Sequence, residues 1–121
     1  MPFEHIIDHG NRLVVVRGTG EGSMEETADS ARRLFEEQSI GRDYSFMFDV
    51  NNIALNPTPS QMWSIASFLE TMLSQFSGRM AIVASEVGKI SAAHMIAFGA
   101  DKGVGRLRVL TSERQALEWL L

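Results

Sequence analysis

Residues 44–84 of the sequence, YSFMFDVNNIALNPTPSQMWSIASFLETMLSQFSGRMAIVA, decide the fold because two apolar runs flank one segment of helix length. The runs at residues 44–50 and 80–84 are rich in apolar and aromatic side chains, which is typical of strands that are buried on both faces. A helix between two strands returns the chain to the same edge by a right-handed crossover, so the strands are expected to pair in parallel. This segment predicts one βαβ unit.

The helix inside this segment has a complete start signal. Thr58 is the expected N-cap, Pro59 occupies the first helical position, and Gln61 has the spacing of a capping box with Thr58. Apolar side chains then recur at the helical period, at Met62, Ile65, Ala66, Leu69, Met72, Leu73 and Phe76. Ser77-Gly78 ends the helix.

The segments on either side continue the same alternation. Residues 3–8 and the β-branched run at 13–16 predict an opening β-hairpin, and the glycine-rich residues 18–22 are expected to end its second strand. Capping-box spacings predict helices after Ser23 and after Ser112. A third helix, from residue 87 or 90 to residue 100, and a strand at 107–110 complete the pattern. We therefore expect an α/β fold, in which an N-terminal hairpin and four βα units form a mostly parallel five-stranded sheet, as a single domain over residues 1–121.

Composition excludes several classes of function. The chain of 121 residues is 45% apolar and 21% charged, as ordinary globular proteins are, and its net charge of −4 argues against nucleic-acid binding. It contains no cysteine, so disulfides, thiolate zinc sites and cysteine nucleophiles are excluded. No signal peptide and no apolar run of about 18 residues is present, so we expect a cytoplasmic protein without membrane insertion.

Four βα units after a starting hairpin, together with two short motifs, resemble the STAS or SpoIIAA-like family over the whole chain. The resemblance is carried by these units, by Gly18-Thr19-Gly20 before the first helix and by the ending VLTSERQALEWL at residues 109–120, in which Ala116, Trp119 and Leu120 match the closing helix of stand-alone bacterial members. It implies the SpoIIAA-like fold and a regulatory, non-catalytic role. The better-known relatives are anti-sigma-factor antagonists, which are switched by phosphorylation of a serine in an Asp-Ser-Ser/Thr-Gly motif.

This chain departs from that motif at residues 56–60, Asn-Pro-Thr-Pro-Ser, which lack the preceding Asp and the following Gly. The phosphorylation switch is therefore not carried over. Phosphate on Ser60 would meet a helix N-terminus favourably, whereas phosphate on Thr58 would replace the capping hydroxyl, and the structural capping role of Thr58 is favoured. Whether either residue is phosphorylated is left open.

Polar residues follow each strand at the edge where parallel α/β sheets bind ligands. The candidate ligand-binding residues at these strand ends are Thr19, Glu21, Asp49, Asn51, Asn52, Ser85 and Thr111. None is a histidine, lysine or arginine placed as a base or oxyanion donor, so no catalytic residue is assigned and an enzyme is not expected. A catalytic Asp49 is the weaker alternative to an Asp49 that accepts backbone N–H groups from the following loop.

Two further motifs are too incomplete to predict a cofactor site or a metal site. The glycine-rich stretch at residues 18–22 has Ser23 where a dinucleotide-binding loop has its third glycine, and Glu21 would repel a pyrophosphate. His5 and His9 are about 13 Å apart on an extended strand, and His94 stands alone in its helix. We therefore expect no metal and no cofactor.

The second helix has an unusually uncharged outer face, because Glu70 is the one charged residue between Pro59 and Phe76. Low-charge surfaces with aromatic residues are typical of interfaces. The predicted interface consists of Trp63, Ser64, Ser67, Phe68, Thr71 and Ser74. The two rings either reach this surface or fold into the core, and both arrangements stay open. The leading hypothesis is a binding or regulatory domain that acts through protein contacts or as a homodimer or larger homo-oligomer.

The alternative hypothesis is a carrier of a small apolar, lipid-like ligand. The same broad fold resembles lipid-binding Sec14-type domains. In addition, residues 91–100 are rich in small and flexible side chains, which leave room for a pocket.

Overall fold

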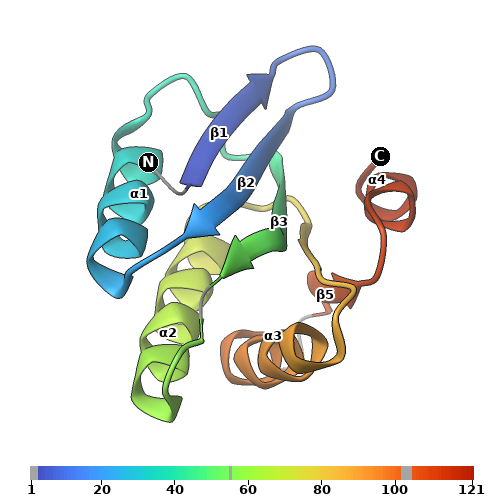
Figure 1. The fold of residues 1–121 in the computed structure, drawn as a ribbon. Helices are drawn as coiled ribbons and strands as arrows, with labels where there is room; N and C mark the ends of the chain where they lie inside the picture. Colours follow the sequence, from blue (N-terminus) through green and yellow to red (C-terminus); the bar gives the residue numbers. More distant parts are fainter. Residues whose placement is uncertain (1–2, 55, 102–104) are drawn as a thin grey trace.

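The computed structural model describes residues 3–54, 56–101 and 105–121. Strands and helices alternate after an opening hairpin (Figure 1). In chain order the elements are β1 (Phe3–Asp8), β2 (Leu13–Glu21), α1 (Met24–Glu36), β3 (Ser45–Ala54), α2 (Pro59–Gln75), β4 (Met80–Val83), α3 (Val87–Ala100), β5 (Leu107–Leu110) and α4 (Glu113–Leu120). This order confirms the predicted hairpin followed by four βα units.

The strands lie side by side in chain order in one five-stranded sheet. β1 pairs with β2 in antiparallel orientation, and the pairs β2–β3, β3–β4 and β4–β5 are parallel. The predicted mostly parallel sheet is therefore confirmed. A sequential order with right-handed crossovers brings the connecting helices to the same face of the sheet.

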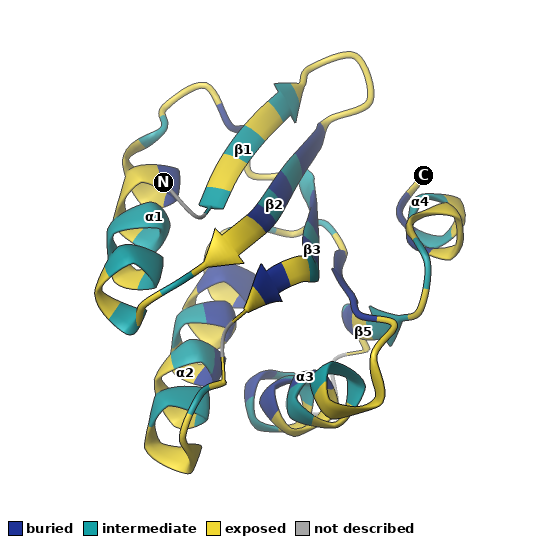
Figure 2. Cartoon of the chain, in the orientation of Figure 1, coloured by how far each residue is buried: buried dark blue, intermediate teal, exposed yellow. Residues whose placement is uncertain are grey.

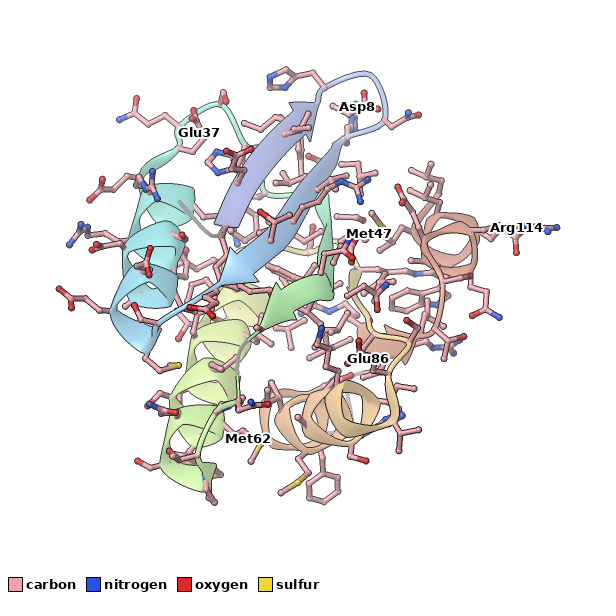
Figure 3. All side chains as sticks on the ribbon, in the orientation of Figure 1. Asp8, Glu37, Met47, Met62, Glu86 and Arg114 are labelled. Atoms are coloured by element: carbon pink, nitrogen blue, oxygen red, sulfur yellow. The ribbon has the colours of Figure 1, made fainter. Side chains whose placement is uncertain are left out.

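Two apolar layers follow from this arrangement. On one face, Val14, Phe46 and Ile82 of the sheet pack against α1, α2 and α3. The side chains next to these along each strand point to the opposite face, where Met47 and Ala81 pack with α4. Figure 1 shows α4 apart from the other helices, and Figure 3 shows Met47 between the sheet and α4.

The glycine-rich stretch does not end β2, so this prediction was wrong. The strand continues to Glu21, and its last residues pair with the extension of β3 to Ala54, past the predicted end of that strand. Gly18 is buried, and a Cβ atom there would lie 2.8 Å from the ring of Phe3. Glycine is therefore required at residue 18 for close packing within the sheet, and not for a turn.

The predicted caps differ in completeness. At α2 the capping box is complete, because the Gln61 N–H donates to Thr58 Oγ1 at 3.2 Å and the Thr58 N–H donates to Gln61 Oε1 at 2.8 Å. Ser23 Oγ accepts the Glu26 N–H and Ser112 Oγ accepts the Gln115 N–H, as expected. The side chains of Glu26 and Gln115, however, make other hydrogen bonds than the capping-box bond to the backbone N–H of the cap. The Glu26 carboxylate accepts the Ser23 hydroxyl, and the Gln115 side chain accepts from Thr111.

Candidate functional site: an apolar cavity between the sheet and three helices

A cavity of about 950 Å³ lies between the sheet and helices α1, α2 and α3. Its sheet side is formed by apolar side chains of the central strands, namely Val16, Phe48, Val50, Ile53 and Ile82. Its helix side is formed by Ala28, Ala31 and Leu34 of α1, by Ile65, Phe68 and Leu69 of α2, and by Ala92, Ala93 and Ile96 of α3. The volume lies near the upper end of the roughly 300–1,000 Å³ that ligand pockets occupy.

The cavity is open on the side of α1 because few side chains of this helix are buried. Leu34 is the one buried residue of α1, and Figure 2 shows most of this helix as intermediate or exposed. Ala28 and Ala31 line the cavity with small side chains. The Phe35 ring meets the Phe68 ring of α2 edge to face at 5.1 Å between centroids, so α1 contacts α2 as well as β1 and the core of the sheet.

An irregularity in β3 determines which side chains line the cavity. The register with β2 shifts between Arg17 and Thr19, so Arg17 pairs with Asp49 while Thr19 pairs with Asn52. One additional residue in β3 breaks the simple alternation of faces. Ile53, which is 2% exposed, therefore lines the cavity together with Val50, and the polar Asn52 is exposed.

Ser64 and Lys89, which line the cavity from α2 and α3, already have protein partners. The Ser64 hydroxyl donates to the Ser60 carbonyl at 3.3 Å. Lys89 Nζ donates to the Asn51 carbonyl at 2.7 Å and lies 3.9 Å from Glu86 Oε2. The donors of these two side chains are therefore occupied without a ligand.

Asp49 is the one residue for which the sequence leaves a catalytic role open. Its side chain points to the face of the sheet opposite the cavity. Asp49 is 8% exposed, and its Oδ2 lies 2.8 Å from Arg17 Nη1. The Asn51 N–H donates to Asp49 Oδ1 at 3.1 Å, as the sequence predicts. Arg17 also pairs with Glu113 at 2.7 Å, and the hydrogen bond to Glu113 is the main reason that the pKa of Arg17 is raised. This network joins β2, β3 and α4.

The other predicted ligand-binding residues divide into three groups. Glu21, Asn51 and Asn52 line a shallow hollow of about 570 Å³ together with Glu86 and Lys89. Ser85 donates its N–H to Asn51 Oδ1 at 2.7 Å. Thr19 and Thr111 lie outside the hollow, and the Thr111 hydroxyl donates to Gln115 Oε1 at 2.9 Å. The strand ends thus bring some of the predicted ligand-binding residues together, and Asp49, Asn51 and Ser85 are hydrogen-bonded to one another in series.

The two aromatic residues of the predicted interface have different environments. Trp63 is 70% exposed, whereas Phe68 is half-buried against Phe35 and lines the cavity. The hydroxyls of the predicted polar strip, Ser64, Ser67, Thr71 and Ser74, donate to backbone carbonyls of their own helix. Figure 3 shows Met62 on the side of α2 that faces α3.

Two exposed residues of α3 enlarge this surface, and sequence reasoning missed them. Met95 is 62% exposed and Phe98 is 89% exposed. A Cβ atom at Gly99 would lie 4.0 Å from the Trp63 ring, which places Trp63 beside the last turn of α3. The sequence of residues 87–100 could have indicated this surface, because a helix over these residues has apolar side chains around its whole circumference and no separate polar face. We call Trp63, Met95 and Phe98 the exposed apolar patch.

The histidines are separated in the structure. His9 Nδ1 lies 2.6 Å from the Tyr44 hydroxyl oxygen, and His94 is exposed on α3. Within residues 3–54, 56–101 and 105–121, no group of three histidine, aspartate or glutamate side chains is arranged to hold a metal ion. None of the helices in that part of the chain is long and apolar enough to cross a membrane.

No family model matches the chain, and no curated protein is significantly similar to it. Among solved structures, the chain is similar to an uncharacterized protein of the DUF3478 family from Shewanella loihica PV-4, whose description names a SpoIIAA-like fold. The identity is 15%, the match covers 98% of this chain and 92% of that one, and the TM-score is 0.67. Together with the sequential sheet and the four helices, this match shows that the chain has a SpoIIAA-like fold.

Proposed function

We propose that this protein is a non-catalytic binding domain whose ligand is a small apolar or amphipathic molecule held between the sheet and helices α1–α3. The observation that carries the proposal is the cavity of about 950 Å³, whose lining is dominated by alanine, leucine, isoleucine, valine and phenylalanine side chains. Water gains little in such a space because it finds few hydrogen-bond partners there, whereas an apolar ligand buries its own surface.

The arrangement of charges supports a binding role over catalysis. Asp49 and Arg17 neutralise each other on the opposite face of the sheet, and Lys89 is bonded to a backbone carbonyl. These groups hold elements of the fold together, and none extends a free base or nucleophile toward the apolar lining. The ligand would therefore be bound and released unchanged.

The test has two parts. Native mass spectrometry of protein purified from its host is expected to show a co-purifying apolar molecule. Titration of the stripped protein with the uncharged fluorophore N-phenyl-1-naphthylamine is expected to show saturable binding. Ala92→Phe places a ring in the cavity and is expected to abolish fluorophore binding. Ser91→Phe adds the same ring at the exposed neighbouring position and is expected to leave binding unchanged. Equal binding by both variants would refute the proposal.

The second candidate function is association with a second copy of the chain, and the exposed apolar patch favours it. Trp63, Met95 and Phe98 present large apolar side chains on two adjacent helices with few charges. Burial of such residues is the usual source of affinity at the centre of an interface. Light scattering over a range of protein concentrations tests this function. Phe98→Glu is expected to give a monomer, while Ile6→Glu, at another exposed apolar residue, on β1, is the control. A wild-type protein that stays monomeric at all concentrations would exclude this candidate.

A further inference from the structure

The polar groups around the cavity differ between its two ends. At the α2–α3 end, the hydroxyl and ammonium groups are bonded to the protein, as described for Ser64 and Lys89. At the β1–α1 end, the lining includes Ser30 and Arg33 of α1 and His5 of β1. Within the described part of the chain, no hydrogen bond to another residue is found for these three side chains. The two ends therefore differ in whether their donors are already occupied.

Ser30 is the clearest example. Among the described residues, its hydroxyl oxygen is the one buried side-chain polar atom without a hydrogen-bond partner. Hydroxyls within helices ordinarily donate to a carbonyl in the preceding turn, and those of Thr27, Ser67 and Thr71 do so here at 2.8–3.0 Å. A buried hydroxyl without a partner is destabilising. A rotation about the Cα–Cβ bond of Ser30 would let it bond to a polar group of a ligand.

Arg33 lies three residues further along α1, on the same side of the helix as Ser30. It lines the cavity, and none of the ion pairs found among the described residues involves it. Its neighbour Arg32 is on the outer side and is paired with Asp29 at 2.9 Å. Both arginines are exposed, but only Arg33 contributes to the lining of the cavity, and Arg32 is the one in an ion pair.

The acidic residues near this end do not cancel the charge of Arg33. Glu4 contributes to the lining, but the alternation along β1 sends its side chain to the opposite face, next to Arg17 in register. Glu37 interacts electrostatically with His5, and its carboxylate accepts the hydroxyl and N–H of Ser39. Among the residues that line the β1–α1 end of the cavity, Arg33 therefore carries the permanent positive charge.

From this geometry we infer that the ligand is an anionic amphiphile, with one apolar chain and one anionic head group that is bound by Arg33 and Ser30. The chain extends along the apolar lining toward Ile65 and Ile96. A guanidinium group binds carboxylate and phosphate oxygens through charge-assisted hydrogen bonds, and a serine hydroxyl adds one more. This inference rests on the proposed function, because it specifies the class of ligand for the same cavity.

The experiment compares ligands with the same chain and different head groups. Dodecanoate, dodecyl phosphate and dodecanol are titrated below their aggregation limits by displacement of N-phenyl-1-naphthylamine. One or both anions are expected to bind about fivefold more tightly than the alcohol, and the stronger anion identifies the head group as carboxylate or phosphate. Arg33→Gln is expected to remove this advantage and Ser30→Ala to reduce it about threefold, each by weakening the binding of the anions more than that of dodecanol. Arg32→Gln removes the same charge from the outer side of α1 and is expected to change nothing.

The outcomes separate this inference from the proposed function. If the anions and the alcohol bind equally, or if Arg32→Gln and Arg33→Gln have the same effect, the anionic head group is refuted while the apolar ligand stands. If none of the three compounds displaces the fluorophore, and the fluorophore itself does not bind, both are refuted. Arg33 and Ser30 are not part of the buried core, so the variants are expected to fold.

Discussion

Ala31→Leu is expected to stabilise the ligand-free protein, although enlarging a residue on the inner side of a helix usually destabilises. Ala31 is half-buried on α1 and lines the cavity. Leucine adds three carbon atoms, and each buried methylene stabilises by about 0.8 kcal/mol, which gives an upper limit of about 2.4 kcal/mol. Restricting the leucine side chain costs about 0.5–1 kcal/mol, and its helix propensity is slightly lower than that of alanine. A net stabilisation of about 1 kcal/mol remains.

Urea unfolding measures this difference. For a protein of this size the slope is about 1–3 kcal/mol per molar urea, so the midpoint of Ala31→Leu is expected to rise by about 0.5 M. Ala81→Leu is the matched control, because Ala81 is 0% exposed and packed between the sheet and α4. There the larger side chain is expected to destabilise by about 1–3 kcal/mol through overpacking. If both variants destabilise to the same extent, the space beneath α1 is not available to a side chain, and the reasoning about the cavity fails.

Four other predictions concern the fold and its local electrostatics. Gly78→Ala is expected to destabilise by more than about 2 kcal/mol in urea unfolding, because a Cβ atom would lie 2.2 Å from a backbone carbonyl oxygen before β3. Gly88→Ala, in the first turn of α3 with open space around it, is expected to stabilise by about 0.5–1 kcal/mol. Asp49→Ala is expected to destabilise by about 1–3 kcal/mol, because this nearly buried carboxylate accepts an N–H and pairs with a guanidinium; a change below about 0.5 kcal/mol would contradict this role. The pKa of Asp8 is lowered chiefly by the side-chain hydrogen bond from Asn11, so Asn11→Ala is expected to raise it in an NMR titration. The stability from this depressed pKa is present above the ordinary value of 3.8 and is lost as the pH falls through the folded-state value.

The sheet was predictable because its signals are local. The apolar runs at residues 44–50 and 80–84 and the cap at Thr58 each require only neighbouring residues to be interpreted. The end of β2 was not predictable in this way. In a sequence, a glycine such as Gly18 usually indicates the end of a strand. The structure shows that the hairpin brings the Phe3 ring beside Gly18, where the ring excludes a side chain.

The cavity was only partly predictable. The small residues of the third helix indicated room for a pocket, but Ala28 and Ala31 follow the same helical period as residues in a filled core. Whether the apolar side chains of such a helix touch the sheet depends on the distance between the helix and the sheet, and a local sequence pattern does not determine that distance. The pairing of Asp49 with Arg17 was missed for the same reason, since it depends on the register of two strands that are 32 residues apart in sequence.

The weak attachment of α1 also affects how quickly a guest could enter and leave. A helix with one buried residue loses little buried apolar contact when it detaches briefly. Its local opening therefore requires far less free energy than unfolding of the strands. Loading and release would then proceed by brief excursions of this one segment while the rest of the molecule stays intact. The rate of exchange would be set by the anchoring of Leu34 and of the Phe35–Phe68 contact.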